Sequence, residues 1–319
     1  MAFCNFTAAS QNHTFSAERA SNEKFAVRVT PDPFRKHQQR VEDEVTFVNF
    51  ISKTGLHHVC SPVQVAKTEP LVISNEKSEV SHDGLVVRLN SLIIVVFSWA
   101  IGSPLGFLEY RWMLDESVIR SVGVWLASFH QYSRDFNTAF PEISARIQRW
   151  NEVHDSVLSS ARVDPIDEAV VSDPQHFGII HGDLNCSNYF FDESTKALSV
   201  FDWDQTQRGW FLWDVAQAIF TVVMLSEAGL PISCTPVPEA NPAAFTDILI
   251  SGYESIAGIG FVDRDRLGRM VLLRKQFYEL FCRRAMSEGD IPVDMSAFIQ
   301  YIVDWFDSEE STISSATAV

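Results

Sequence analysis

Apolar and polar side chains alternate along much of the N-terminal third of the chain. Asn12–Ala17 and Phe25–Val29 have the two-residue period of short β-strands, and a polar turn joins them. Leu85–Ser98 supplies further strand material, with Asn90-Ser91 as a turn inside it. In contrast, Lys36–Ile51 has the spacing of apolar residues that predicts a helix, and Gly55 suits its C-terminal end. The pattern therefore predicts a small antiparallel, β-rich region with one main helix.

Helical spacing dominates the chain from Asp115 onward. After a first helix that contains Phe129, further helices are expected at about Pro141–Ser160, Leu212–Gly229, Pro242–Ala257, Asp263–Met286 and Asp294–Ser308. Ser311–Val319 is small and mostly polar, and we expect it to fray. The chain changes character near Ser98 and then meets the breakers Gly102, Pro104 and Gly106. We therefore expect an α+β protein with a β-rich lobe at residues 1–98 and a larger, mostly helical lobe at 99–319.

A predicted β-hairpin with polar residues directly before and after its strands interrupts the helical region. Two apolar runs, Tyr189–Phe191 and Leu198–Phe201, flank a polar turn. The chain enters through a loop that carries Asp183 and Asn188, and it leaves through Asp202. Carboxylate and carboxamide oxygens placed in this way suit chemistry on a Mg²⁺-bound phosphate, where one carboxylate accepts a hydroxyl proton and the other oxygens hold the metal.

The spacing sharpens this interpretation. Asp183 and Asn188 are 188 − 183 = 5 positions apart, the interval of D-x-x-x-x-N in the protein-kinase catalytic loop. The alternative is a turn whose Asp and Asn side chains bond only local backbone. The presence of all three residues in order, with strand signals between them, favours the functional interpretation.

The motif HGDLNxxN, followed by a strand that ends in FDWD, resembles the aminoglycoside phosphotransferase family, whose relatives include choline kinase-like and homoserine kinase-like enzymes. The resemblance implies a bilobal protein-kinase-like fold and ATP-dependent transfer of a phosphate to a small-molecule hydroxyl. It implies that Asp183 is the catalytic base and that Asn188 and Asp202 bind Mg²⁺. The 1–98 lobe would bind the nucleotide, and the 99–319 lobe would carry the catalytic loop and the substrate pocket.

Four neighbouring residues are candidates for supporting roles. His181, directly before the loop, is interpreted as a structural residue. Asn185 orients either the substrate hydroxyl or the loop itself. Asp204 follows Asp202 by two positions, so on an extended strand both carboxylates face the same side, and Asp204 is either a second ligand or only a neighbour. The resemblance implies that Asp214 braces the catalytic loop through backbone hydrogen bonds.

The predicted nucleotide-binding site depends on a basic residue in a strand. The resemblance places Arg28 against the nucleotide phosphates, fixed by Glu44 on the predicted helix, with Glu42 as the alternative partner; otherwise Arg28 is an ordinary strand arginine that faces water. The turn before Asn12 would cover the phosphates but contains no glycine, the residue that lets a backbone approach phosphate closely. Either this loop stands further away or Ser10 and Gln11 contribute side-chain contacts.

The formal net charge is -16, from 25 Lys+Arg and 41 Asp+Glu. Such a surface repels nucleic acid and anionic membranes and tolerates cationic substrates, so we expect neither nucleic acid nor membrane as a partner. The five cysteines include no CxxC pair, and the N-terminus has no signal-peptide pattern. We therefore expect free thiols and a cytoplasmic location.

Other enzyme classes lack their signatures, because G-x-S-x-G, HExxH and G-x-x-x-x-G-K-[ST] are all absent. The remaining rival is a kinase-like nucleotide-binding protein without turnover. For the acceptor we expect first an amine-bearing alcohol, such as an amino alcohol, hydroxy amino acid or aminoglycoside, then a neutral sugar, and last a protein. The candidate acids for binding the amine are Glu227, Glu239, Glu254, Asp263, Asp265 and Glu279.

Overall fold

The computed structural model describes residues 3–9, 12–56, 58–65, 72–73, 76–77, 79–80, 84–153, 173–229, 240–288 and 296–317. The chain divides into two compact units that each combine several segments. The first unit comprises Met1–Pro104, Gln131–Ile147 and Asn188–Thr206, and the second comprises Leu105–His130, Gln148–Ser187 and Gln207–Val319.

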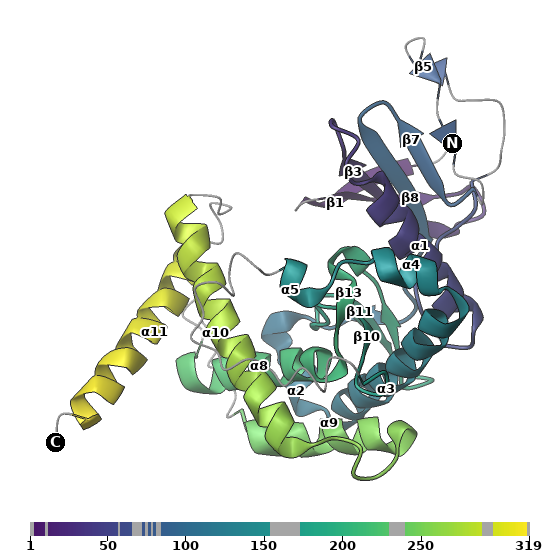
Figure 1. Cartoon of the computed structure of the whole chain (residues 1–319). Coiled ribbons are helices and arrows are strands. Elements are labelled where there is room, and N and C mark those ends of the chain that lie inside the picture. The colour runs from purple at the N-terminus through teal and green to yellow at the C-terminus, as the bar shows by residue number, and fades with distance from the viewer. Residues whose placement is uncertain are drawn as a thin grey trace. The chain divides into compact units, whose positions relative to one another are not determined.

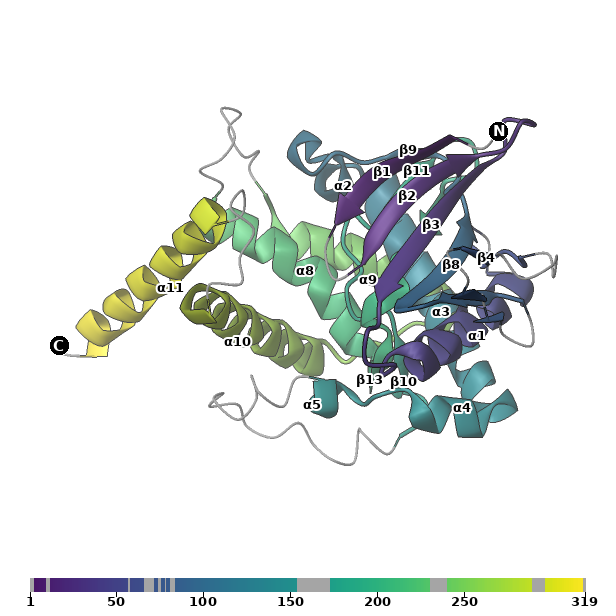
Figure 2. The ribbon, with the colours of Figure 1, turned by 90° about the horizontal axis from the view of Figure 1, so that it is seen from above.

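An antiparallel sheet is the main β-structure of the first unit (Figures 1 and 2). Its strands, in spatial order, are β1 (Phe3–Ala9), β2 (His13–Glu18), β3 (Lys24–Pro31), β8 (Leu92–Ser98), β7 (Val86–Leu89) and β6 (Glu79–Val80). Two short strands, β4 (Val72–Ile73) and β5 (Glu76–Lys77), pair separately. Asn90, at φ 56°, makes the left-handed turn between β7 and β8. The predicted strands and this turn are confirmed.

The helix α1 (Gln38–Lys53) carries the core of the first unit. Its apolar face is fully buried, and Phe47 meets the Phe136 ring edge-on with centroids 5.1 Å apart. Phe136 lies in the last turns of α3 (Glu116–Ala139), and α4 (Pro141–Arg146) follows. Arg146 of α4 forms an ion pair of 2.6 Å with Asp43 of α1, so the edge of α1 is fixed by charge as well as by apolar contact.

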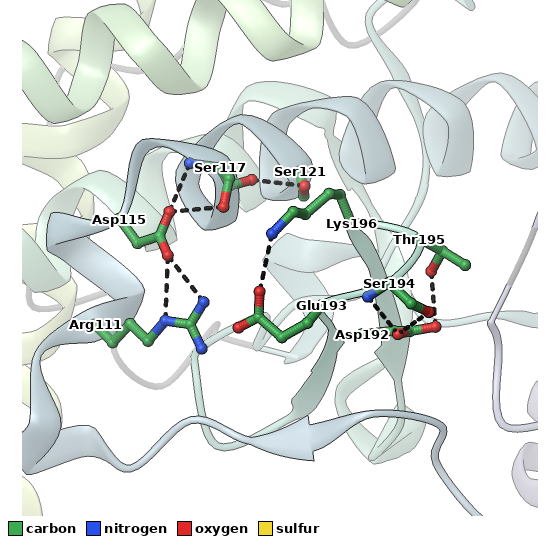
Figure 3. A network of polar contacts seen from close by, with 9 residues as sticks. All are labelled: Arg111, Asp115, Ser117, Ser121, Asp192, Glu193, Ser194, Thr195 and Lys196. Atoms are coloured by element: carbon green, nitrogen blue, oxygen red, sulfur yellow. Dashed lines mark hydrogen bonds and ion pairs between the residues drawn. The ribbon is translucent and has the colours of Figure 1, made fainter.

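The predicted hairpin is present as β11 (Tyr189–Asp192) and β12 (Ala197–Val200), with β9 (Ser103–Pro104) on the free edge of β11. Its turn is ordered by Asp192, whose carboxylate accepts hydrogen bonds from the Ser194 amide at 2.9 Å and the Ser194 hydroxyl at 2.7 Å (Figure 3). Gly102, at φ 96°, lies so close to Phe191 that an added Cβ would be 2.4 Å from its carbonyl oxygen. The hairpin therefore has a defined turn and a covered edge.

The second unit is mostly helical. A two-stranded antiparallel pair, β10 (Phe177–Ile180) and β13 (Gln207–Trp210), contacts the helix that follows it, α8 (Phe211–Ala228). The helical elements are η1 (Phe107–Glu109), α2 (Arg111–Leu114), the first part of α3, α5 (Trp150–Val153), α8 (Phe211–Ala228), α9 (Pro242–Ala257), α10 (Arg264–Glu288) and α11 (Ser296–Thr317). Helix α8 packs against α9 and α10, and α10 packs against α11 (Figure 2). Within the described part of the chain, α8 alone is long and apolar enough to cross a membrane, but 61% of it is buried in the protein, as in a core helix.

Two predicted helix boundaries are wrong. The helix expected at Pro141–Ser160 ends at Arg146, and residues 154–172 lie outside the described part. The chain leaves the helical path here and pairs with a strand, because the Gln148 carbonyl accepts a hydrogen bond of 2.8 Å from the amide of Arg208 in β13. At the C-terminus, α11 continues to Thr317 through residues that the sequence predicted to fray.

Candidate active site

A fully buried carboxylate forms hydrogen bonds to the backbone of the loop that follows β10. Asp214, in the first turn of α8, accepts hydrogen bonds of 2.9 Å from the backbone amides of both His181 and Gly182. Gly182 has φ 83°, a conformation that favours glycine. The bracing contacts expected of Asp214 are therefore present. These hydrogen bonds fix the backbone of the two residues that precede Asp183.

Sequence reasoning missed the residue that completes this brace. His130 of α3 is fully buried, with Nε2 at 3.2 Å from the Asp214 carboxylate and Nδ1 at 2.9 Å from the Tyr253 hydroxyl. Its ring stacks on Phe211 with centroids 4.3 Å apart. The only sequence signal is a histidine next to the apolar stripe of α3. A buried His–Asp contact cannot be read from such a position, because the partners are 84 positions apart.

The side chain of Asp183 is half-buried, and the amide Nε2 of Gln217 on α8 donates to its Oδ1 at 3.3 Å. Asn185 bonds within the loop, because its Nδ2 donates to the Asp183 carbonyl at 3.3 Å and its Oδ1 accepts from the Ser187 amide at 2.9 Å. His181 is fully buried, and its Nδ1 accepts from the Asp183 amide at 3.4 Å. These contacts support structural roles for Asn185 and His181 and leave Asp183 as the carboxylate that the loop presents.

Cys186 lies inside the same loop but has no reactive character. Its side chain is buried, and burial raises the pKa of the thiol to about 12. A thiol with such a pKa is protonated at neutral pH and is a poor nucleophile. Cys186 therefore fills space in the loop and is a free thiol, as expected for the cysteines of this chain.

In the first unit, the hairpin brings Asn188 and Asp202 to the same end. The strands pair with Tyr189 opposite Val200, and the Phe201 amide donates to the Asn188 carbonyl at 3.0 Å. Asn188 is buried, whereas Asp202 is exposed in a left-handed conformation with φ 64° and ψ 68°. Magnesium is usually bound by one or two protein oxygens together with substrate phosphates and water. One exposed carboxylate and one carboxamide on adjacent strand ends therefore fit Mg²⁺.

No group of three or more His, Cys, Asp or Glu side chains in the described part of the chain could hold a metal without such a substrate. Asp204 does not continue an extended strand, as the sequence suggested, because Trp203–Gln205 forms a 3-10 helix after Asp202. The premise that Asp202 and Asp204 face one side as strand neighbours is wrong. Asp204 instead accepts a hydrogen bond of 3.1 Å from the Asn12 side chain, and Asn12 accepts one of 2.6 Å from the Thr30 hydroxyl.

Arg28 on β3 and Glu44 on α1 form the predicted ion pair, with 2.8 Å between Arg28 Nη1 and Glu44 Oε1. Glu42, the alternative partner, is bonded by Gln38 one turn earlier on α1. Both members of the pair are buried, and the Nε and Nη2 atoms of Arg28 have no hydrogen-bond partner among the described residues. Two buried donors of a permanently charged guanidinium are thus available to an anion.

The charges around this pair favour a cation at Arg28. Burial lowers the pKa of Arg28, but the carboxylates of Glu44, Asp204 and Asp202 raise it more, so the net shift is upward. Burial raises the pKa of Glu44 although Arg28 opposes the shift. Arg28, Glu44, Asn188, Asp202 and Asp204 all belong to the first unit, whereas Asp183 and Asp214 belong to the second. Ser10 and Gln11, the predicted phosphate-loop contacts, lie outside the described residues.

Residues 5–233 match the phosphotransferase enzyme family known as APH. The chain belongs to this family. This phosphotransferase is therefore a small-molecule kinase that uses a nucleotide, as the resemblance implied. No curated protein sequence matches the chain.

Solved structures show that this phosphotransferase has the kinase-like fold predicted from its motifs. An amicoumacin kinase in complex with AMP-PNP, Ca²⁺ and Ami is similar at a TM-score of 0.65 and 17% identity, covering 96% of this chain and 88% of that one. A choline/ethanolamine kinase family protein from Mesorhizobium loti has a TM-score of 0.53 at 12% identity, with coverage of 97% and 87%. Aminoglycoside 2'-phosphotransferase-IIIa in its GDP complex has a TM-score of 0.54 at 13% identity, with coverage of 97% and 93%. At these identities the likeness establishes the fold and not the acceptor.

Proposed function

We propose that the protein transfers the γ-phosphate of ATP, in a Mg²⁺-dependent reaction, to a hydroxyl group of a small molecule that also carries an amine. The observation that carries the proposal is the ordered set Asp183, Asn188 and Asp202, with the loop before Asp183 braced by Asp214. The complex of the amicoumacin kinase with AMP-PNP and Ca²⁺ supports a nucleotide together with a divalent cation. The net charge of -16 supports a cationic group on the acceptor.

Each side chain has a distinct role in this proposal. Asp183 orients the acceptor hydroxyl and accepts its proton as the oxygen attacks phosphorus. Arg28, held by Glu44, binds phosphate oxygens through its two unpartnered donors. Asn188 and Asp202 would hold Mg²⁺, which supplies neutralisation of the phosphate charge. Positioning and electrostatics supply most of the catalysis in phosphoryl transfer, so a rigidly braced loop is the appropriate device.

A nucleotide-binding protein without turnover is the second candidate, because the segment Ala8-Ala9-Ser10-Gln11 has no glycine to admit phosphate closely. The two candidates differ in one observable result. A kinase consumes ATP in the presence of an acceptor, whereas the second candidate binds Mg·ATP and transfers phosphate to nothing.

The test combines a binding measurement with an acceptor screen. Titration calorimetry of ATP with and without Mg²⁺ should show Mg²⁺-dependent binding in the wild type and its loss in Asp202→Ala. Glu193→Ala is the matched control, because Glu193 is an exposed carboxylate on the same hairpin, paired with Lys196 in the turn. An unchanged affinity of Asp202→Ala for ATP in Mg²⁺ would show that Asp202 is not a metal ligand. An ATP-consumption screen over amino alcohols, hydroxy amino acids, aminoglycosides and sugars then tests turnover.

A further inference from the structure

Helix α10 carries a buried cation that has no counter-charge in contact with it. The Arg274 side chain is only 9% exposed, and its Nε has no hydrogen-bond partner among the described residues. Its guanidinium lies over two aromatic rings, 5.0 Å from the Trp213 centroid and 5.4 Å from that of Phe277. In the described part of the chain, no carboxylate lies within ion-pair distance of this guanidinium. A buried charge without a partner is costly, so a residue of this kind calls for an explanation.

The position of Arg274 connects it to the proposed base. Trp213 and Gln217 are four residues apart on α8 and therefore share a face, and α8 packs against α10. Gln217 donates from Nε2 to Asp183, and Arg274 is close enough to Asp183 to interact with it electrostatically. Burial lowers the pKa of Arg274 to about 10, an effect that the charges of Asp183 and Asp214 oppose without cancelling. The cation is still fully protonated at neutral pH.

Gln217 adds a second unsatisfied atom on the same face. Because a carboxylate only accepts hydrogen bonds, the Nε2 of Gln217 must point to Asp183 and its Oε1 must point away. That Oε1 is buried and has no partner among the described residues. The region next to Asp183 thus contains an unpaired donor on a cation, Arg274 Nε, and an unpaired acceptor, Gln217 Oε1. Buried polar atoms are rarely left unpaired in proteins, and a ligand with an anionic group and a donor group would satisfy both.

We propose that Arg274 binds a carboxylate of the acceptor, so that the substrate is a hydroxy acid, and with the amine a hydroxy amino acid. This inference rests on the proposed function, because it assigns the substrate class of that reaction. The carboxylate accepts hydrogen bonds from the guanidinium, and the ammonium or hydroxyl group of the substrate donates to Gln217 Oε1. Four of the six acids first considered as amine ligands have other partners: Glu227 pairs with Lys275, Glu254 accepts from the amides of Gly260 and Val262, Asp263 accepts from the Arg266 amide, and Glu279 pairs with Arg283. Asp265 is exposed in the first turn of α10. Glu239 lies outside the described residues.

The test uses acceptors that differ only in the carboxylate. A panel of hydroxy amino acids is compared with the matched amides and decarboxylated amino alcohols, with serine, serinamide and ethanolamine as the smallest set. Binding is measured by titration calorimetry and turnover by ATP consumption. For the wild type we expect the carboxylate form to bind about 10- to 100-fold better than its amide, as for a hydrogen bond to a charged group. Arg274→Gln should lose this preference while binding the amide as the wild type does.

Two further variants separate charge from folding. Arg274→Lys keeps the cation and should retain part of the preference, whereas Arg269→Gln changes an exposed arginine of the same helix and should change nothing. Equal losses for acid and amide in Arg274→Gln would overturn the proposal and indicate that Arg274 acts through Asp183. A weaker affinity for ATP, with affinity for the acid unchanged, would also overturn it and indicate that Arg274 acts on the nucleotide. Phosphorylation only of acceptors without a carboxylate would also overturn it. If no acceptor is phosphorylated, the proposed function fails, and the binding data alone decide whether Arg274 recognises carboxylates.

Discussion

Asp183 is the residue on which the proposed chemistry depends, and its contacts are compatible with the role of a base. Its loop is fixed at the backbone by Asp214, and Gln217 donates a hydrogen bond to its carboxylate. A positioned general base contributes about 10²- to 10⁴-fold in rate. In the proposed mechanism its charge does not contact the nucleotide, so a substitution can separate the two functions.

We therefore expect Asp183→Asn to lose about 10²- to 10⁴-fold in phosphate transfer while its affinity for Mg·ATP stays unchanged. The asparagine preserves the size of the side chain but cannot accept a proton. Single-turnover measurements with an acceptor from the screen, together with ATP titrations, check both parts. Turnover at the wild-type rate would remove Asp183 from the role of base.

Asp214 is expected to matter for stability as much as for the loop. Asp214→Ala leaves the amides of His181 and Gly182 and one nitrogen of His130 without their buried acceptor. Each unsatisfied buried group costs about 1–3 kcal/mol, so the free energy of unfolding should fall by several kcal/mol. Urea denaturation checks this, with Asp247→Ala as the control because Asp247 forms an exposed ion pair with Arg264. A similar loss in both variants would contradict the bracing role.

For individual residues, the sequence predicted those that belong to a motif. It missed those whose partners are brought close only by the fold. The interval between Asp183 and Asn188 follows from a local pattern, and the Arg28–Glu44 pair was implied by the family resemblance. His130, Gln217 and Arg274 have no local signature, because each acquires its importance from a partner distant in the chain. Arg274 in particular is spaced like any arginine on an amphipathic helix, and only its burial distinguishes it.

Among the elements, α3 has a well-defined start that can be tested. Asp115 precedes the helix and accepts hydrogen bonds from the Ser117 amide at 2.9 Å and from the Ser117 hydroxyl at 2.6 Å (Figure 3). Arg111 donates to its other oxygen from Nε at 3.2 Å and from Nη2 at 2.9 Å. The Ser117 hydroxyl bond is the main cause that lowers the pKa of Asp115 from 3.8 to about 2, and Arg111 adds to it.

Asp115→Ala should destabilise the protein at neutral pH by about 1 kcal/mol, the usual cost of a lost helix N-cap. Because the pKa of Asp115 is lower in the folded state, its contribution is present above about pH 4 and is lost as the pH falls toward 2. The difference between wild type and variant should therefore shrink over that interval. Urea denaturation at several pH values measures it, and a difference that is constant with pH would contradict the assignment to this carboxylate.

Element prediction succeeded where one pattern covers a whole segment and failed where a tertiary contact decides. The hairpin at 189–200, the strands β2 and β3 and the helices α8 and α9 follow from periodicity and turn residues alone. The predicted helix after Pro141 fails because the carbonyl of Gln148 bonds the Arg208 amide, a pairing between segments far apart in the chain. The direction of Asp204 was missed for a related reason, since a 3-10 turn replaces the expected strand after Asp202.

For the molecule as a whole, the proposed sites divide between the two units. The residues proposed to bind Mg·ATP, namely Arg28, Glu44, Asn188 and Asp202, all belong to the first unit. The residues proposed to bind the acceptor, namely Asp183, Gln217 and Arg274, all belong to the second. Because a ligand stabilises what it contacts, each substrate should leave its own signature along the chain.

Hydrogen–deuterium exchange can therefore test the division directly. Mg·ATP at about 100 times its dissociation constant stabilises the bound state by about 2.7 kcal/mol, or roughly 100-fold in the opening equilibrium. We expect this protection in β3, in α1 and around Asn188 and Asp202, and we expect it to disappear in Asp202→Ala. A carboxylate acceptor alone should instead slow exchange in α8 and α10, and Arg274→Gln should remove that effect. Equal protection of α8 and α10 by Mg·ATP alone would contradict the division, because the nucleotide would then act on the elements assigned here to the acceptor.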